Sequence, residues 1–156
     1  MHSALESGRL SIIQRLLDDG ADVNERDESF QTPLNLASES GKVDIAKTLI
    51  KYGADVNSRQ IHGWTPLHTA ARCGHVDVAH LLLTDGADMN VTEWDGLTAL
   101  HLASMNSRSD VVPLLLEWGA NVQARCLYGK TPSQYALSLG YRNIVRLLSE
   151  NVVGRV

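Results

Sequence analysis

A stretch near the middle of the chain shows the pattern on which the whole sequence is built. Thr65 can accept a hydrogen bond from a first-turn N–H, and Pro66 presets the backbone at the first helical position. Gly74 then ends this helix, because a residue without a Cβ reaches left-handed backbone angles at little cost. The following run, residues 76–83, places apolar residues at helical spacing. The stretch therefore predicts two short helices joined by a tight turn.

The same pattern recurs at a step of 33 residues along the chain. The threonines that begin the pattern are Thr32, Thr65, Thr98 and Thr131, and the glycines that follow the second helix are Gly20, Gly53, Gly86 and Gly119. A 33-residue period with these Thr-Pro-Leu-His and Gly-Ala-Asp-Val-Asn signals resembles the ankyrin repeat family over nearly the whole chain. The resemblance implies an all-α fold, an ankyrin-repeat solenoid of stacked helix-turn-helix units with hairpin-like finger loops.

The chain is expected to form a single domain, 1–156, because stacked repeats bury one continuous core. We expect a partial N-terminal capping repeat at 1–26, full repeats at 27–59, 60–92 and 93–125, and a C-terminal capping repeat at 126–156; these are numbered one to five below. The partial repeat is either a natural cap or the boundary of a longer array. In the last repeat Ser133 and Ser149 replace leucine or isoleucine, as a terminal cap requires, and residues 152–156 are expected to fray.

Two repeats depart from the pattern. Phe30 stands where the other full repeats have glycine at the finger tip, so we expect a different backbone there. In repeat four Ser107 replaces the glycine between the helices, and Pro113 falls inside the second helix, where proline loses a hydrogen bond. A late helix start with Ser109 as its cap would place Pro113 near the first turn and limit that cost. Repeat four is therefore predicted to be the least stable.

Composition suggests neither a nucleic-acid nor a membrane partner. The formal net charge is −4 and 44% of residues are hydrophobic, which is ordinary for a globular protein. No apolar run approaches the ~20 residues that a membrane span needs, and the first residues lack the apolar core of a signal peptide. The two cysteines, Cys73 and Cys126, occupy different positions of different repeats, as suits a reducing compartment. We therefore expect a cytoplasmic or nuclear protein.

The histidines invite a metal interpretation, but their positions favour a structural one. His2, His68 and His101 share one repeat position, which Asn35 and Gln134 also occupy. A position that accepts these three residue types needs a hydrogen-bonding side chain near a helix start. No Cys/His cluster has zinc spacing, no calcium loop is complete, and phosphate loops and nucleophile arrangements are missing. The sequence therefore predicts no enzyme activity, no cofactor and no metal.

The asparagines that close the repeated Asp-Val-Asn or Asp-Met-Asn motif have two interpretations. They are Asn24, Asn57 and Asn90. The family resemblance implies that asparagines in this setting can be substrates of an asparaginyl hydroxylase. The alternative, which we favour for their role, is that each bonds to backbone at the base of a finger.

The positions that the fold leaves free carry the partner prediction. The resemblance implies that fingers and first helices line a concave groove in which partners dock. The candidate partner-binding residues are Arg59, Ile61, His62, Trp64, Arg72, Trp94, Asp95, Leu97, Met105, Arg125, Leu127, Tyr128 and Lys130. Large apolar side chains and arginines that a scaffold does not require are typical of interfaces. Alternatively, Ile61, Trp94 and Leu127, which share one position, merely cover neighbouring fingers. Trp118 ends a second helix and is expected to pack locally.

These observations predict a non-catalytic protein–protein interaction module. Its groove would bind a partner protein or peptide segment that carries apolar anchors and acidic residues, chiefly along repeats three to five. No nucleic acid and no membrane is expected as a partner. The alternative is a structural spacer or targeting domain of a larger protein whose activity lies outside this chain.

Overall fold

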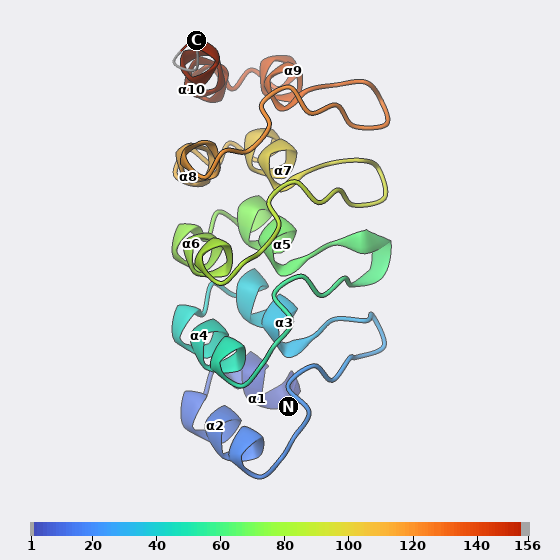
Figure 1. The fold of residues 1–156 in the computed structure, drawn as a ribbon, viewed down its shortest axis with the longest axis vertical. Coiled ribbons are helices and arrows are strands. Elements are labelled where there is room, and N and C mark those ends of the chain that lie inside the picture. Colours follow the sequence, from blue (N-terminus) through green and yellow to red (C-terminus); the bar gives the residue numbers. More distant parts are fainter. Residues whose placement is uncertain (1, 154–156) are drawn as a thin grey trace.

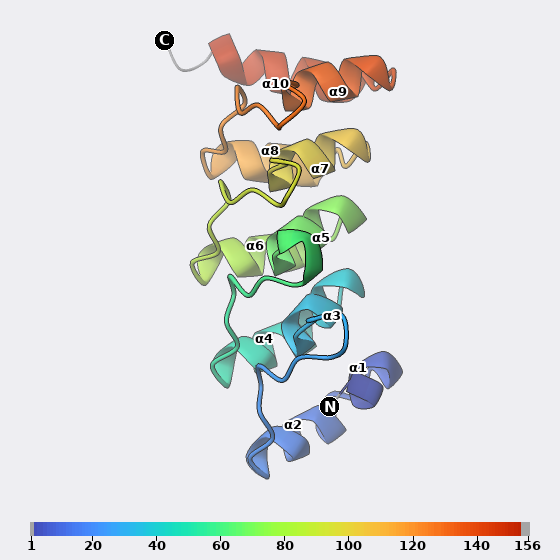
Figure 2. The same ribbon diagram turned by 90° about the vertical axis from the view of Figure 1, so that its right-hand side faces the viewer.

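The computed structural model describes residues 2–153, with side chains described for all but residues 2, 6, 7 and 151–153. Over this range the chain forms ten α-helices and one 3-10 turn, with no β-strand. The helix pairs are α1 (His2–Ser7) and α2 (Leu10–Asp18), α3 (Pro33–Glu39) and α4 (Val43–Lys51), α5 (Pro66–Cys73) and α6 (Val76–Thr84), α7 (Ala99–Met105) and α8 (Val111–Glu117), and α9 (Pro132–Ser138) and α10 (Arg142–Val153). The pairs stack in one column in chain order (Figures 1 and 2). The predicted all-α solenoid is confirmed.

Each full first helix is capped by the predicted threonine, which directly precedes it. The capping hydroxyls, those of Thr32, Thr65, Thr98 and Thr131, each accept a hydrogen bond from the backbone N–H three residues later. The side chain of that later residue in turn accepts from the N–H of the threonine. In repeat three, Nδ1 of His68 accepts from the N–H of Thr65 at 3.2 Å, which leaves Nε2 to donate to the Leu97 carbonyl of the next repeat, also at 3.2 Å. The hydrogen-bonding role predicted for this position is confirmed; the side chain of His2 lies outside the described residues.

One continuous core runs along the column between the helix pairs. Leu49, Leu82, Leu115 and Leu148 repeat at 33-residue intervals and are no more than 2% exposed. Leu34, Leu67 and Leu100 form a second such row, at 1% or less. Because each repeat covers the apolar face of its neighbour, the stack buries a core without a globular shape. No helix among residues 2–153 is long and apolar enough to cross a membrane.

The finger of repeat two does not differ from the others in the way expected. Phe30 has φ 60°, close to the 78° of Gly63 and the 77° of Gly96 in the same position. The turn is imposed by Asp27, whose Oδ1 accepts from the N–H groups of Ser29 and Gln31, both at 2.8 Å. Phe30 therefore adopts the left-handed conformation of glycine, at a cost of about 1 kcal/mol.

Repeat four begins its second helix late, as the position of Pro113 requires. α6 begins at Val76, so the 33-residue step would start α8 at Ser109, but α8 starts at Val111. Pro113 is thus the third helical residue, where an N–H would have no helical partner. The predicted cap is wrong: Asp110, not Ser109, precedes the helix, and it makes no side-chain capping bond. Ser107 is left-handed, with φ 55°.

The last repeat has the expected polar substitutions. Ser133 is half-buried in the position of the leucine row, and Ser149 is exposed. The predicted fraying is not observed at residues 152–153, which continue α10. The remaining residues of the predicted frayed tail, 154–156, lie outside the described range.

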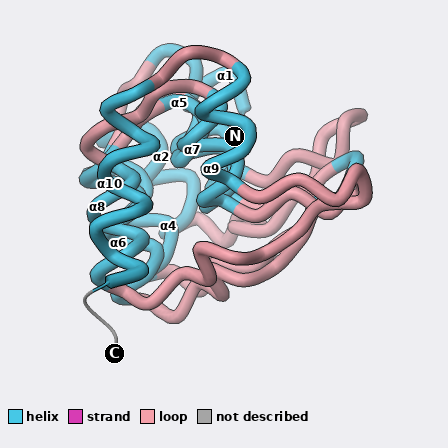
Figure 3. The backbone as a smooth tube through the Cα atoms, turned by 90° about the horizontal axis from the view of Figure 1, so that it is seen from above, coloured by secondary structure: helices cyan, strands magenta, loops and turns pink. Residues whose placement is uncertain are grey.

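The fingers project together from the side of the first helices (Figures 1 and 3). Neighbouring tips are joined by backbone hydrogen bonds, which the sequence did not indicate. These bonds run from Ile61 N to Ser29 O (3.4 Å), from Trp94 N to His62 O (3.0 Å) and from Leu127 N to Asp95 O (2.9 Å). We call the surface formed by finger segments 26–31, 59–64, 92–97 and 125–130 and helices α3, α5, α7 and α9 the finger–helix surface.

Candidate functional site

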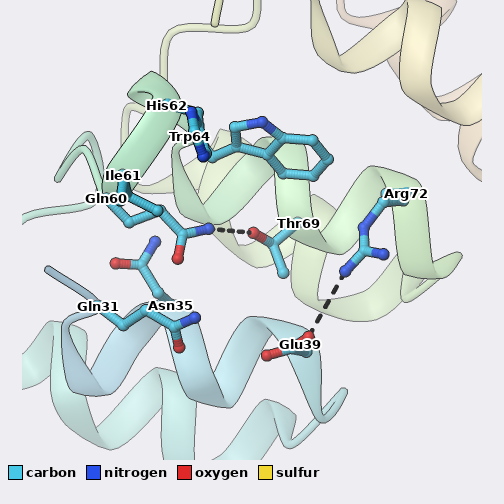
Figure 4. Close-up of a pocket in the computed structure, with 9 residues that line it drawn as sticks. All are labelled: Gln31, Asn35, Glu39, Gln60, Ile61, His62, Trp64, Thr69 and Arg72. Atoms are coloured by element: carbon cyan, nitrogen blue, oxygen red, sulfur yellow. Dashed lines mark hydrogen bonds and ion pairs between the residues drawn. The ribbon is translucent and has the colours of Figure 1, made fainter. Parts of the chain in front are cut away.

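A pocket of about 270 Å³ opens on the finger–helix surface between repeats two and three. Its lining residues are Gln31, Asn35, Glu39, Gln60, Ile61, His62, Trp64, Thr69 and Arg72. Helix α3 forms one side and helix α5 with the preceding 3-10 turn (Ile61–Gly63) forms the other (Figure 4). Four of the predicted partner-binding residues, Ile61, His62, Trp64 and Arg72, therefore meet at one site.

Arg72 is held on two sides within this pocket. Its guanidinium carbon lies 5.3 Å from the centre of the Trp64 ring, and its Nη2 lies 3.5 Å from Oε1 of Glu39 in the preceding repeat. The two charged side chains are 43% and 48% exposed, so solvent screening limits the ion pair to at most about 1 kcal/mol. Arg72 therefore lines the pocket with an acidic partner, and its charge is not unpaired.

Two buried N–H groups in the pocket have no hydrogen-bond partner: Nδ2 of Asn35 and Nε of Arg72. Asn35 is 1% exposed, and its Oδ1 accepts from the backbone N–H of Thr32 at 3.0 Å. Because a backbone N–H can only donate, the amide oxygen must face Thr32, and the orientation of the Asn35 amide is settled. Its NH2 group is thus an unpartnered donor, in a pocket that already contains a second one.

The finger tips carry the largest exposed apolar side chains of the predicted set. Ile61, Trp94, Leu127 and Tyr128 are 47%, 65%, 76% and 69% exposed. The Trp94 ring packs edge-on against His62 of the preceding finger, with centroids 4.9 Å apart. The alternative interpretation, in which Trp94 covers a neighbouring finger, therefore holds for part of its ring, but most of the side chain remains exposed.

Three predicted cations, Arg59, Arg125 and Lys130, are exposed on this surface. Nη1 of Arg59 donates to the Thr92 carbonyl at 3.2 Å, and Nη1 of Arg125 donates to the Gly129 carbonyl at 2.6 Å. Lys130 lies over a tyrosine ring, 5.2 Å from its centre. Neither ion pair in the described part of the chain includes any of the three. Their charges therefore face solvent.

The remaining predicted residues extend the surface rather than join the pocket. Asp95 accepts from the Tyr128 hydroxyl at 3.4 Å, which links the last two fingers. Leu97 is half-buried, and its carbonyl receives the bond from His68. Met105 is half-buried at the end of α7, one repeat beyond Arg72. The predicted residues thus form a row along the surface, with the pocket at its N-terminal end.

The repeated asparagines connect neighbouring repeats. Nδ2 of Asn24 donates to the Gly53 carbonyl at 3.2 Å, and its Oδ1 accepts from the N–H of Asp55 at 2.9 Å. Asn57 makes the same pair of bonds one repeat later, with Gly86 and Asp88. Bonding to backbone is confirmed for these two, although it reaches into the next repeat. Asn90 is exposed, and hydroxylation of the three asparagines stays a prediction.

The buried histidines of the core have a structural role. Burial lowers the pKa of His68 to about 4 and also lowers the pKa of His101, so both rings are neutral near pH 7. Among the described residues no group of three or more His, Cys, Asp or Glu side chains could hold a metal ion. Trp118 packs edge-on against His80, with centroids 6.2 Å apart, in agreement with local packing.

The sequence-based prediction missed several residues of this surface. Asn35, Gln60 and Thr69 line the pocket, and Phe30 is 56% exposed at the finger tip of repeat two. Asn35 carries a readable signal, because histidine occupies this position in three other repeats, as His2, His68 and His101. The two residue types are not equivalent in hydrogen bonding here, because His68 reaches the next finger whereas Nδ2 of Asn35 has no partner.

A family model described as ankyrin repeats (3 copies) matches residues 1–93 and 86–154. No curated protein matches the chain.

Proposed function

The chain belongs to the ankyrin repeat family, and from that premise we propose that it binds a segment of a partner protein along its finger–helix surface. Ankyrin repeats are generally protein–protein interaction modules, and family members are typically not enzymes. The proposed site comprises the fingers and first helices of repeats three to five, together with the pocket at the junction with repeat two. The bound segment is extended or helical.

The observation that carries this proposal is the exposure of large side chains that the fold does not need. Neighbouring finger tips are joined through backbone atoms, so any residue type except proline could make those bonds. Yet Trp94, Leu127 and Tyr128 stand at the tips with 65–76% of their surface exposed. Tryptophan, tyrosine and arginine dominate the binding energy of protein interfaces, and contiguous exposed apolar surface is typical of docking sites.

The chemistry of the surface supports a partner with apolar anchors and acidic residues. Arg59, Arg125 and Lys130 present unpaired charge next to the apolar tips, whereas Asp95 is the one acid among the candidate residues. Opposite charge on the partner would speed its encounter with this surface. We also propose a cytosolic or nuclear location, which the free thiols of Cys73 and Cys126 support.

Selection of peptides tests the proposal. A displayed library of random linear peptides is selected for binding to the immobilised chain. The affinities of the enriched peptides are then measured for the unmodified chain and for the Trp94→Ala and Trp118→Ala variants. Both tryptophans are exposed, at 65% and 40%, but Trp118 lies at the end of α8, away from the fingers. We expect Trp94→Ala to lower affinity at least about tenfold and Trp118→Ala to leave it unchanged. Equal affinity for the two variants, or no enriched peptide, would overturn the proposal.

A further inference from the structure

We propose that the pocket between repeats two and three binds a carboxylate side chain, aspartate or glutamate, of the partner segment. This inference rests on the proposed function and adds the chemistry of one contact to it. It comes from the two unpartnered N–H donors of the pocket and from a comparison of the same position in successive repeats.

The residue at position 35 accounts for one unsatisfied donor in the pocket. Nε2 of His68 reaches the Leu97 carbonyl of the next finger, 29 residues on, and His101 reaches the Lys130 carbonyl by the same step. In repeat two the position holds Asn35, whose shorter amide makes the bond to the capping threonine but leaves Nδ2 without a partner. The exchange of histidine for asparagine therefore leaves a buried donor unsatisfied, as happens where a ligand supplies the missing acceptor.

Arg72 supplies a second donor and the positive charge. Its Nη2 bonds Glu39 and its guanidinium lies on the Trp64 ring, but its Nε is buried without a partner. A carboxylate is acceptor-only and can take hydrogen bonds on both oxygens, so its chemistry matches both kinds of donor that this pocket offers, the Asn35 amide and the Arg72 guanidinium. An ammonium group would instead bring N–H groups against N–H groups. The aliphatic stem of the bound residue would lie against Trp64 and Ile61.

Glu39 provides a way to distinguish an acidic occupant of the pocket from a basic one. Its carboxylate holds Arg72 through one bond of 3.5 Å and is about half exposed, so it can turn to solvent. For an acidic occupant Glu39 is a like charge and a competitor for the same guanidinium. Glu39→Gln should therefore tighten the binding of an acidic occupant, whereas it should weaken the binding of a basic one.

The test uses the 156-residue chain and one peptide enriched from the random linear library. We expect the enriched peptides to share an aspartate or glutamate, and its replacement by the corresponding amide to weaken binding about tenfold or more. Asn35→His should weaken the binding of the unmodified peptide by a similar factor, because histidine fills the pocket. The melting temperature of this variant should stay equal or rise, because the histidine can reach the Trp64 carbonyl. Glu39→Gln should tighten the binding of the unmodified peptide.

Several outcomes would overturn this inference. Unchanged affinity of Asn35→His, or weaker binding by Glu39→Gln, would show that the pocket does not hold a carboxylate. If Asn35→His does not fold, the acid-to-amide peptide and Glu39→Gln still decide. Peptides that depend on Trp94 but not on these changes would overturn the pocket assignment and leave the proposed function standing. Absence of any enriched peptide would overturn both.

Discussion

Trp94 contacts His62 of the preceding finger twice, once through the backbone and once through the ring. Its N–H donates to the His62 carbonyl at 3.0 Å, and the two rings meet at 86° with centroids 4.9 Å apart. The backbone bond belongs to the scaffold, since the equivalent bond recurs between the other fingers. Despite the ring contact, Trp94 is 65% exposed. The Trp94 side chain is therefore positioned by the stack while its larger part remains available to a partner.

This geometry separates binding from stability. Trp94→Ala should weaken partner binding by about 2–4 kcal/mol and change the free energy of unfolding far less, because the ring is mostly exposed. Leu82→Ala should do the reverse and cost about 2–5 kcal/mol of stability, because Leu82 is fully buried between the repeats. Urea denaturation and peptide titration of both variants provide the comparison. If Trp94→Ala unfolds as readily as Leu82→Ala, the ring belongs to the core and the site is misplaced.

Trp64→Ala is expected to differ from Trp94→Ala. Trp64 is half-buried and lies under the Arg72 guanidinium, at 5.3 Å. Its removal should therefore lower both peptide affinity and, to a smaller extent than Leu82→Ala, stability. The same two measurements apply. A Trp64→Ala variant with unaltered affinity for a peptide that still requires Trp94 would remove the pocket from the binding surface.

Electrostatic steering should depend on the three unpaired cations. Association of an acidic peptide should slow as salt rises, because exposed charges act over about a Debye length, ~8–10 Å near physiological ionic strength. Replacement of Arg59, Arg125 and Lys130 by glutamine should flatten this dependence in stopped-flow experiments. Arg72→Gln is the matched control and should change the dissociation rate more than the salt dependence, because Arg72 is already paired with Glu39. A flat profile of the unmodified chain would exclude steering.

The stability of the array should fall below pH 6.5 because of its buried histidines. The folded-state pKa of His68 is lowered to about 4 by burial, so between its unfolded and folded pKa values only the unfolded chain binds the proton. Stability is thus full above the unfolded pKa and is lost as pH falls towards 4. The loss reaches up to about 3 kcal/mol for His68, and His101 adds to it in the same direction.

His68→Gln is the control for this pH dependence, because Gln134 occupies the same position in repeat five and accepts from the N–H of Thr131 at 2.9 Å. Denaturation midpoints measured between pH 7 and pH 4 should fall less steeply for the variant. Identical slopes would show that His68 does not carry the effect.

Repeat four should be the easiest to open. Ser107 holds a left-handed backbone with φ 55°, so Ser107→Gly should stabilise the chain by about 1 kcal/mol. Pro113→Glu should add little, because Pro113 lies in the first turn of α8. We expect amides of residues 106–110 to exchange sooner than those of residues 73–77. Equal protection of the two segments, or a double variant without added stability, would contradict the weak-repeat hypothesis.

Local sequence chemistry was sufficient for the repeat and its helix starts. The capping threonines and the hydrogen-bonding role of the histidine position follow from neighbours within a few residues, and the 33-residue step is read directly from the sequence, so no distant contact was needed to predict them. The residue types on the finger–helix surface were also readable, because the repeat register identifies positions that do not build the core.

The tertiary structure alone decided which of those side chains have partners, because the distances across repeat boundaries are not encoded in any local pattern. The pairing of Arg72 with Glu39 joins residues 33 positions apart, so the charge of Arg72 is already partly balanced within the surface. The unsatisfied amide of Asn35 depends on how far a histidine reaches compared with an asparagine across the same boundary. Phe30 is left-handed because the carboxylate of Asp27 holds the turn, which outweighs the preference of phenylalanine for other backbone angles.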